Sequence, residues 1–261
     1  KLEDYLQTEW PELKVYLTSV TDHFGTISVC GPNSKKILKK ITSNIDYSDE
    51  TFPHMSFKEG LIDKIKCRVM RISFTGELSY EINIQANYAL SVWKKCMEAG
   101  REFGITPYGT ESMHLLRAEK GFIIVGQETD GTITPVDLQM DWIVSKKKYD
   151  FIGKRSLYRS DTIREDRKHY VGLLTKNPNE ILEEGAQIVS EVKNKPPMSM
   201  IGHVTSSYYS PNLNKSIALA VVKNGKKLKG KKLYVPMPNK TIEVTVSDPV
   251  FLDKEGIKLN A

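Results

Sequence analysis

The alternation of hydrophobic and polar positions is most regular over residues 67–84. In the second half of this stretch, one face carries only apolar residues: Leu78, Tyr80, Ile82 and Ile84. The opposite face carries Ser79, Glu81 and Asn83. With the run at 67–73 and a break in which Gly76 is free to adopt a positive φ, this pattern predicts a β-hairpin of strands 67–73 and 78–84. Glu81 thus points away from the apolar core, to a side where most strand glutamates are simply solvated.

The same kind of pattern predicts a mixture of helices and strands in the first 165 residues. Strands are predicted at 15–20 and 25–30, and helices at 1–10, 32–41, 88–99, 109–120 and 154–160. Gly121 is expected to end the helix at 109–120 in a C-cap role. This order of elements is typical of the α+β class.

After a charged stretch at 160–168 the pattern changes to short strands separated by turns. The strands are predicted at 170–175, 187–192, 201–206, 216–222, 231–235 and 241–247. Asn-Gly and Lys-Gly turns at 224–225 and 229–230 lie between the strands at 216–222 and 231–235. This spacing predicts a small antiparallel β-barrel. We therefore expect two domains, an α+β region at 1–165 and a C-terminal β-barrel at 166–261.

Composition narrows the class of protein. The 261 residues are 39% hydrophobic and 27% charged, as in soluble globular proteins. No apolar run approaches the roughly 20 residues that span a bilayer, and the first residues lack a signal-peptide layout. The three cysteines are odd in number and widely spaced, which favours reduced thiols and no metal site. We expect a cytoplasmic protein without a membrane partner.

Charge and short motifs do not indicate a reaction. The net charge is +6, and the densest basic segment is 226–232. Such a segment can attract nucleic acid, a membrane or a polyanion, but no nucleic-acid-binding motif accompanies it, so a solvated strand pair with a glycine turn is expected. The histidines lack metal-ligand spacing, and the glycines form no dinucleotide or P-loop fingerprint. The residues alone predict a two-part α+β protein without an assigned function.

Five sequence blocks, read in order, change this interpretation. They lie at 71–81, 116–135, 142–148, 150–157 and 201–211. Together they resemble the folate-binding fold of the glycine cleavage T-protein. They are still more similar to the C-terminal half of the α subunit of heterotetrameric sarcosine oxidases. The Gly-Gln-Glu-Thr-Asp-Gly form at 126–131 favours the latter.

The resemblance implies a tetrahydrofolate site in the hairpin. In this superfamily a glutamate binds the pterin ring of tetrahydrofolate, and an aromatic residue lies seven positions before it in the sequence. The corresponding residues here are Glu81 and Phe74. A pterin presents a ring N–H beside an exocyclic amine, two parallel donors that match the two oxygens of a carboxylate. Trp142 is a further candidate wall for the ring, with core packing as the equal alternative.

Other positions carry weaker implications. Glu77 and Arg117 are secondary candidates for folate contact. Arg117 and Glu119 match a Leu-Arg-x-Glu helix of the family, in which an intramolecular ion pair is the expected role. Met113 stands where T-proteins have an arginine that helps to bind folate, so lysines are the candidates to bind the folate tail.

The resemblance also implies an aspartate that supports one-carbon transfer, upstream of residue 1. The catalytic residue is therefore unknown in this chain, because Asp46, Asp63 and the other aspartates belong to different blocks. We expect a T-protein-like fold that is N-terminally incomplete, from a fragment or a natural short form.

The implied function is that of the tetrahydrofolate-binding portion of a sarcosine oxidase α subunit. It would capture the one-carbon unit of oxidised sarcosine as 5,10-methylenetetrahydrofolate. FMN or FAD and NAD would belong to the full complex, outside this chain, and a flavin-containing β subunit would be its partner. Two alternatives remain open: an aminomethyltransferase of the glycine cleavage system, and a non-catalytic scaffold for subunit assembly.

Overall fold

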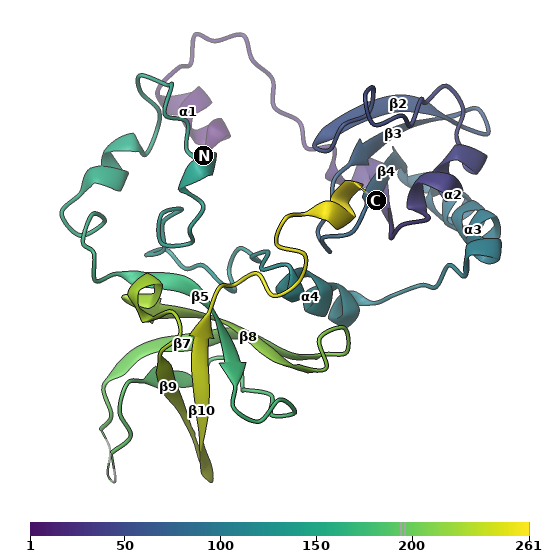
Figure 1. Cartoon of the computed structure of the whole chain (residues 1–261). Helices are drawn as coiled ribbons and strands as arrows, with labels where there is room; N and C mark the ends of the chain where they lie inside the picture. Colours follow the sequence, from purple (N-terminus) through teal and green to yellow (C-terminus); the bar gives the residue numbers. More distant parts are fainter. Residues whose placement is uncertain (194, 196, 261) are drawn as a thin grey trace. The chain divides into compact units, whose positions relative to one another are not determined.

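The computed structural model describes residues 1–193, 195 and 197–260. The chain forms two compact units (Figure 1). Unit 1 comprises Lys1–Ser73, Glu77–Thr106 and Leu259–Ala261, and unit 2 comprises Phe74–Gly76 and Pro107–Lys258. The predicted domain boundary lies between residues 165 and 166. The two compact units divide the chain at other positions, so this domain boundary stays a prediction. Within the described residues, no helix has the length and apolar character needed to cross a membrane.

Unit 1 contains a four-stranded antiparallel sheet with the order β1-β4-β3-β2. Two helices pack on one face of this sheet (Figure 1). The strands are β1 (Phe24–Cys30), β2 (Ser56–Ile62), β3 (Ile65–Arg71) and β4 (Ser79–Gln85). The helices are α1 (Leu2–Thr8), α2 (Ser34–Ile41) and α3 (Ala89–Gly100), with 3-10 turns η1 (Thr21–His23), η2 (Ala86–Tyr88) and η3 (Arg101–Phe103).

The core of unit 1 lies between the sheet and the helices α2 and α3. It contains Leu38 of α2, Val92 of α3 and the apolar residues of β4, all of which are fully buried. Because side chains alternate along a strand, burying the apolar positions of β4 turns its polar positions to the other face of the sheet. The helices of the unit leave that face uncovered.

Most sequence-based predictions for unit 1 are confirmed. Strands β3 and β4 pair as the predicted antiparallel hairpin, and Gly76 between them has a φ of 81°. The predicted strand at 15–20 is wrong, because this segment has no regular structure and Tyr16 in it is 94% exposed. Strand β2 was not predicted, since the Lys-Glu-Gly sequence at 58–60 interrupts its apolar alternation.

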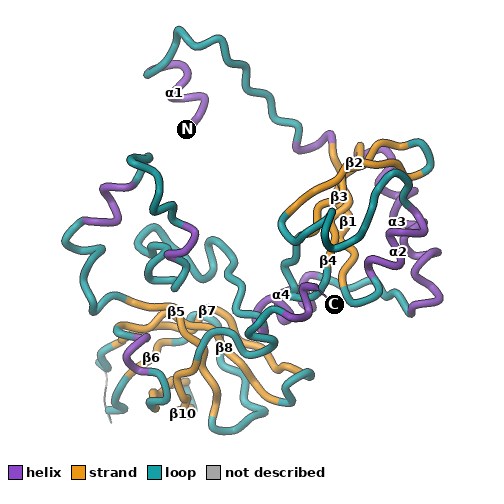
Figure 2. Tube along the Cα trace, turned by 45° about the horizontal axis from the view of Figure 1, so that its top comes forward, coloured by secondary structure: helices purple, strands orange, loops and turns teal. Residues whose placement is uncertain are grey.

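Unit 2 consists of a helix, long loops and a closed barrel, in agreement with the predicted small antiparallel barrel (Figure 2). The strand order is β10-β5-β8-β7-β6-β9. The strands are β5 (Lys168–Thr175), β6 (Gln187–Val189), β7 (Met200–Ser210), β8 (Lys215–Lys223), β9 (Lys232–Met237) and β10 (Lys240–Ser247). The helix is α4 (Thr110–Glu119), and the 3-10 turns are η4 (Asp141–Ile143), η5 (Lys154–Tyr158) and η6 (Gly225–Leu228). A last 3-10 turn, η7 (Ile257–Asn260), begins in unit 2 and ends in unit 1.

Helix α4 ends as predicted. Gly121 follows it with a φ of 72°, and a Cβ atom at this position would lie 2.6 Å from the Pro249 carbonyl oxygen. Both the left-handed backbone and the close approach require glycine here.

The basic segment 226–232 lies on the surface of unit 2, where several of its lysines form ion pairs. Lys227 pairs with Glu165 at 2.5 Å and Lys229 pairs with Asp248 at 2.7 Å. Lys232 pairs with Glu243 across β9 and β10 at 3.0 Å. These pairs fit the expected solvated surface.

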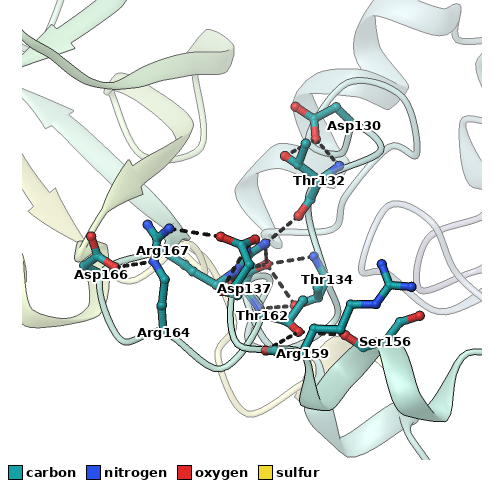
Figure 3. A network of polar contacts seen from close by, with 11 residues as sticks. Asp130, Thr132, Thr134, Asp137, Ser156, Arg159, Thr162, Arg164, Asp166 and Arg167 are labelled. Carbon is teal, nitrogen blue, oxygen red and sulfur yellow. Dashed lines mark hydrogen bonds and ion pairs between the residues drawn. The ribbon is translucent and has the colours of Figure 1, made fainter.

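A buried carboxylate in the loop before the barrel, that of Asp137, binds Arg167, the residue directly before the first barrel strand β5 (Figure 3). Asp137 receives two hydrogen bonds from the Arg167 guanidinium, at 2.9 Å from Nε and 2.8 Å from Nη2. It also accepts hydrogen bonds of 2.8 Å from the backbone N–H and the hydroxyl of Thr134. Burial alone would raise the pKa of the Asp137 carboxyl, but these hydrogen bonds hold that pKa below its ordinary value. A depressed pKa stabilises the fold at neutral pH, and this contribution disappears as the pH falls through the folded-state pKa.

Replacing Asp137 by asparagine is expected to lower the free energy of unfolding of unit 2 by about 2 kcal/mol at pH 7. The Arg167 side chain is only 9% exposed and would lose its bidentate partner, while its ion pair with Asp161 and its hydrogen bond to the Thr132 carbonyl oxygen would remain. Urea unfolding followed by circular dichroism measures the change. The matched control is Asp166→Asn, which breaks the surface pairs with Arg164 and Lys223 and should have a much smaller effect. Equal effects of the two variants would contradict the structural role of Asp137.

Candidate functional site

The uncovered face of the sheet in unit 1 carries a row of polar side chains from β4. Glu81 lies in this row between Ser79 and Asn83. The register places Ser28 of β1 on one side of Glu81 and Met70 of β3 on the other. Strand β4 is an inner strand of the sheet, so Glu81 is held by paired backbone on both sides. The alternation that predicted its direction is thus confirmed.

The Glu81 carboxylate is half-buried and lacks a partner among the described residues. Within the described part of the chain, no hydrogen bond or ion pair reaches it, and burial raises its pKa above the ordinary value of 4.5. Removing a charged group from water without a compensating partner is unfavourable, and such groups in native proteins call for an explanation. A ligand with hydrogen-bond donors would supply the missing partner.

Neighbouring polar groups on this face are partly paired. The Thr26 hydroxyl donates to Oδ1 of Asn83 at 3.3 Å, and the Ser28 and Ser79 hydroxyls are 3.5 Å apart. The side-chain amide nitrogen of Asn83 is buried and has no partner among the described residues. Sequence reasoning placed Asn83 on this face but assigned it no role. Its unpaired donor becomes visible only once the neighbouring strands are in register.

A groove with a volume of about 680 Å³ runs over the sheet beside Asn83. Its lining comes from unit 1 alone: Val20, Thr21, Phe24, Thr26, Asn44, Glu59, Gly60, Leu61, Lys66, Cys67, Arg68 and Asn83. This volume suits a small organic molecule.

The other residues predicted from the hairpin lie near its turn. Phe74 is half-buried in the segment Phe74–Gly76, which belongs to unit 2, whereas Glu81 belongs to unit 1. Glu77 is also half-buried and belongs to unit 1. Phe74 thus belongs to unit 2, whereas Glu77 and Glu81 belong to unit 1.

Trp142 lies in η4 and is 75% exposed. The alternative of core packing for this residue is therefore wrong. An exposed indole keeps its ring face available for stacking, whether on a ligand or on another polypeptide.

Arg117 has a different environment. Its side chain and that of Glu128 are both 0% exposed, and the two form an ion pair of 2.9 Å. Arg117 also donates to the Ser206 hydroxyl of β7 at 2.6 Å. The expected intramolecular ion pair is confirmed for Arg117, with Glu128 as its partner, but no ion pair of Glu119 is found among the described residues. Glu119 instead accepts a hydrogen bond of 2.5 Å from the Ser210 hydroxyl.

Asp46 and Asp63 serve local structure. Backbone and side-chain hydrogen bonds from Ser48 and a hydrogen bond from Thr51 lower the pKa of Asp46 to about 2. Asp63 lies in the turn between β2 and β3 with a φ of 49° and pairs with Lys95 of α3. Both remain unassigned to catalysis.

Comparison with known families and structures agrees with this fold. The GCVT N-terminal domain matches residues 1–148, and the glycine cleavage T-protein C-terminal barrel domain matches residues 168–253. A crystal structure of glycine cleavage system aminomethyltransferase T from Bartonella henselae superimposes with a TM-score of 0.74 at 22% identity. That likeness covers 88% of this chain and 60% of the other, and it shows the shared fold.

Several curated proteins are similar over nearly the whole chain. Sarcosine oxidase subunit alpha of Corynebacterium sp. (strain P-1) is 50% identical over 258 residues, which is 98% of this chain and 27% of that protein. Sarcosine oxidase subunit alpha of Rhizobium meliloti (strain 1021) is 36% identical over 99% of this chain and 26% of its own length. An aminomethyltransferase of Thermoanaerobacter pseudethanolicus is 30% identical over 92% of this chain and 63% of its own. The chain thus spans about a quarter of the sarcosine oxidase subunits that it matches.

Proposed function

The chain belongs to the glycine cleavage T-protein family, and on this premise we propose that it binds tetrahydrofolate with Glu81 as the residue that holds the pterin ring. The observation that carries the proposal is the half-buried Glu81 carboxylate, which has no partner in the described chain. A pterin edge offers two adjacent N–H donors to such a carboxylate, and a bidentate charge-assisted contact of this kind is strong and directional.

We also propose two aromatic residues as walls for the pterin ring. Phe74, at the turn of the hairpin, would offer an apolar surface to the ring. Trp142, with its exposed indole, is the second proposed wall. Glu77 is a weaker candidate near the same turn. Arg117 is engaged inside unit 2, so we assign it a structural rather than a ligand-binding role.

The wider proposal concerns the reaction that the folate serves. Because the chain is similar to sarcosine oxidase α subunits, we propose that it forms the folate-binding portion of such an enzyme, alongside a flavin-containing subunit. Bound tetrahydrofolate would supply N5 as the nucleophile that captures the one-carbon unit released from oxidised sarcosine. The residues of this chain would orient the pterin and exclude water from it.

The direct test is a calorimetric titration of the purified chain with folinic acid. We expect saturable binding with one site per chain. p-Aminobenzoylglutamate, which lacks the pterin, serves as the comparison ligand and should bind far more weakly. Absence of folinic acid binding would overturn the proposal and leave the assembly-scaffold role as the better account.

The pH dependence of folate affinity is a second expected result. The contact needs an ionised carboxylate, because a protonated carboxyl presents one donor against the two donors of the pterin. Since burial raises the pKa of Glu81, affinity should decline on acidification from a higher pH than an ordinary glutamate would give. Titrations from pH 7.5 to pH 5 measure this decline. A wild-type profile identical to that of Glu81→Gln would contradict the assignment.

A further inference from the structure

Three residues of the turn between β3 and β4 belong to unit 2, where they pack against Lys120. These residues are Phe74–Gly76. Gly76 has a φ of 81°, and a Cβ atom at this position would lie 2.8 Å from Cγ and 2.9 Å from Cδ of Lys120. The Thr75 hydroxyl oxygen is buried without a partner among the described residues, so this side chain does not anchor the turn by a hydrogen bond. The aliphatic stem of Lys120 packs directly on the backbone of the turn instead.

The ammonium group of Lys120 is held by Asp253, which also belongs to unit 2. Both side chains are 9% exposed, and Nζ of Lys120 lies 3.1 Å from Oδ2 of Asp253. The same Nζ donates a hydrogen bond to the Asp253 carbonyl oxygen. Because two acceptors of one residue fix the ammonium group, the stem of Lys120 stays against Gly76.

Asp253 is fixed by the backbone that follows it. Its Oδ1 accepts a hydrogen bond of 2.9 Å from the Ile257 N–H, and its Oδ2 accepts one of 3.1 Å from the Lys258 N–H. Burial by itself would raise the pKa of the Asp253 carboxyl, but the hydrogen bonds from Lys120 and from these N–H groups hold that pKa below its ordinary value. Asp253 is therefore ionised opposite Lys120 at neutral pH.

The backbone of Lys120 is constrained as well. Lys120 directly follows α4, and the carbonyl oxygen of Glu119 accepts hydrogen bonds of 2.9 Å from both the Phe251 and the Leu252 N–H. The chain after β10 thus runs beside the end of α4 (Figure 1). Since Lys120 is held both at its backbone and at Nζ, it forms a rigid support for the turn.

We propose that Lys120 positions the aromatic wall of the pterin site, because its stem holds the turn in the place from which the Phe74 ring meets the pterin. Lys120 does not touch the ligand and acts through Phe74. A stacking contact depends on the distance and tilt of the two rings, so a turn that shifts loses this contact without any change at Glu81. The proposal rests on the proposed function and adds to it the residue that sets the position of Phe74.

The test is a double-mutant cycle on folinic acid affinity, measured by calorimetry with Phe74→Ala, Lys120→Ala and the double variant. Each single variant is expected to weaken binding about three- to tenfold. In the Phe74→Ala background, Lys120→Ala should weaken binding further by at most about twofold, since the residue through which it acts is already gone. Additive weakening in the double variant would overturn the positioning role, and so would wild-type affinity in Lys120→Ala.

Two further variants separate positioning from a loss of stability. Asp137→Asn removes a buried ion pair of unit 2 that does not involve the turn, so it should keep wild-type affinity. Weakening by Asp137→Asn equal to that by Lys120→Ala would show a general effect of lower stability and overturn the proposal. Asp253→Asn keeps the Lys120 stem but weakens its anchor, and it replaces Lys120→Ala in the cycle if that variant does not fold. The same non-additivity with Phe74→Ala is expected, and an additive result would again overturn the role of Lys120.

The wild type separates this proposal from the function on which it rests. Absence of folinic acid binding by the wild type would overturn the proposed function and the role of Lys120 together. An additive cycle in a protein that does bind folinic acid would overturn the role of Lys120 alone.

Discussion

Replacing Arg117 by methionine is expected to lower the free energy of unfolding of unit 2 by about 3–5 kcal/mol. The Arg117 and Glu128 side chains are 0% exposed, so the substitution leaves a buried carboxylate without its cation. Glu128 would keep hydrogen bonds from the Ile124 N–H at 2.7 Å and the Ser206 hydroxyl at 2.5 Å. These two bonds reduce the loss but do not replace the charge. Native-state hydrogen exchange of β7 and β8 amides measures the effect within unit 2.

A double variant provides the control for this experiment. In Arg117→Met/Glu128→Gln the uncompensated charge is absent, and replacing a whole buried ion pair is often nearly neutral. The double variant should therefore be more stable than Arg117→Met alone. If the two proteins unfold at the same denaturant concentration, the ion pair is not the cause of the loss.

Replacing Glu81 by glutamine is expected to weaken folinic acid binding about 30- to 150-fold, equivalent to about 2–3 kcal/mol. Glutamine has nearly the same shape, but it replaces one acceptor oxygen by a donor that faces a donor of the pterin. Binding is measured by calorimetry at pH 7.5, where the wild-type carboxylate is ionised.

Glu98→Gln is the matched control for the Glu81 variant. It removes the same charge from an exposed position of α3, on the helical side of the sheet. We expect wild-type affinity from it. Unchanged affinity in Glu81→Gln, with native circular dichroism, would refute the role of Glu81.

The elements with clean periodicity could be predicted from the sequence. Strands β4, β9 and β10 bury alternate side chains against a core, so hydrophobic alternation predicts them directly. Strand β2 is held by its pairing with β3, and its own residues 58–60 are polar or glycine. Residues 15–20 show the converse, since their apolar and β-branched composition is typical of a strand but no neighbouring strand pairs with them in the described chain. Tertiary pairing, not local pattern, decides both cases.

The candidate site could be predicted in part. The alternation of β4 predicts the direction of Glu81, and family resemblance suggests the ligand that we propose for it. The groove could not be predicted, because it depends on the register that sets Asn83 beside Thr26 and Arg68. The buried partner of Arg117 could not be predicted either, since Glu128 lies eleven positions later in a loop without periodicity.

The unpaired Glu81 carboxylate places binding and stability in conflict at one position. Its raised pKa means that the folded protein holds this proton more tightly than the unfolded chain does, so the fold loses stability as the pH rises through that pKa. A neutral residue at position 81 would avoid the unfavourable burial of a charge, but it would also remove the proposed ligand contact. Selection for heat resistance alone would therefore favour replacing Glu81. Substitutions intended to stabilise this protein should leave Glu81 unchanged and be placed elsewhere in the sheet.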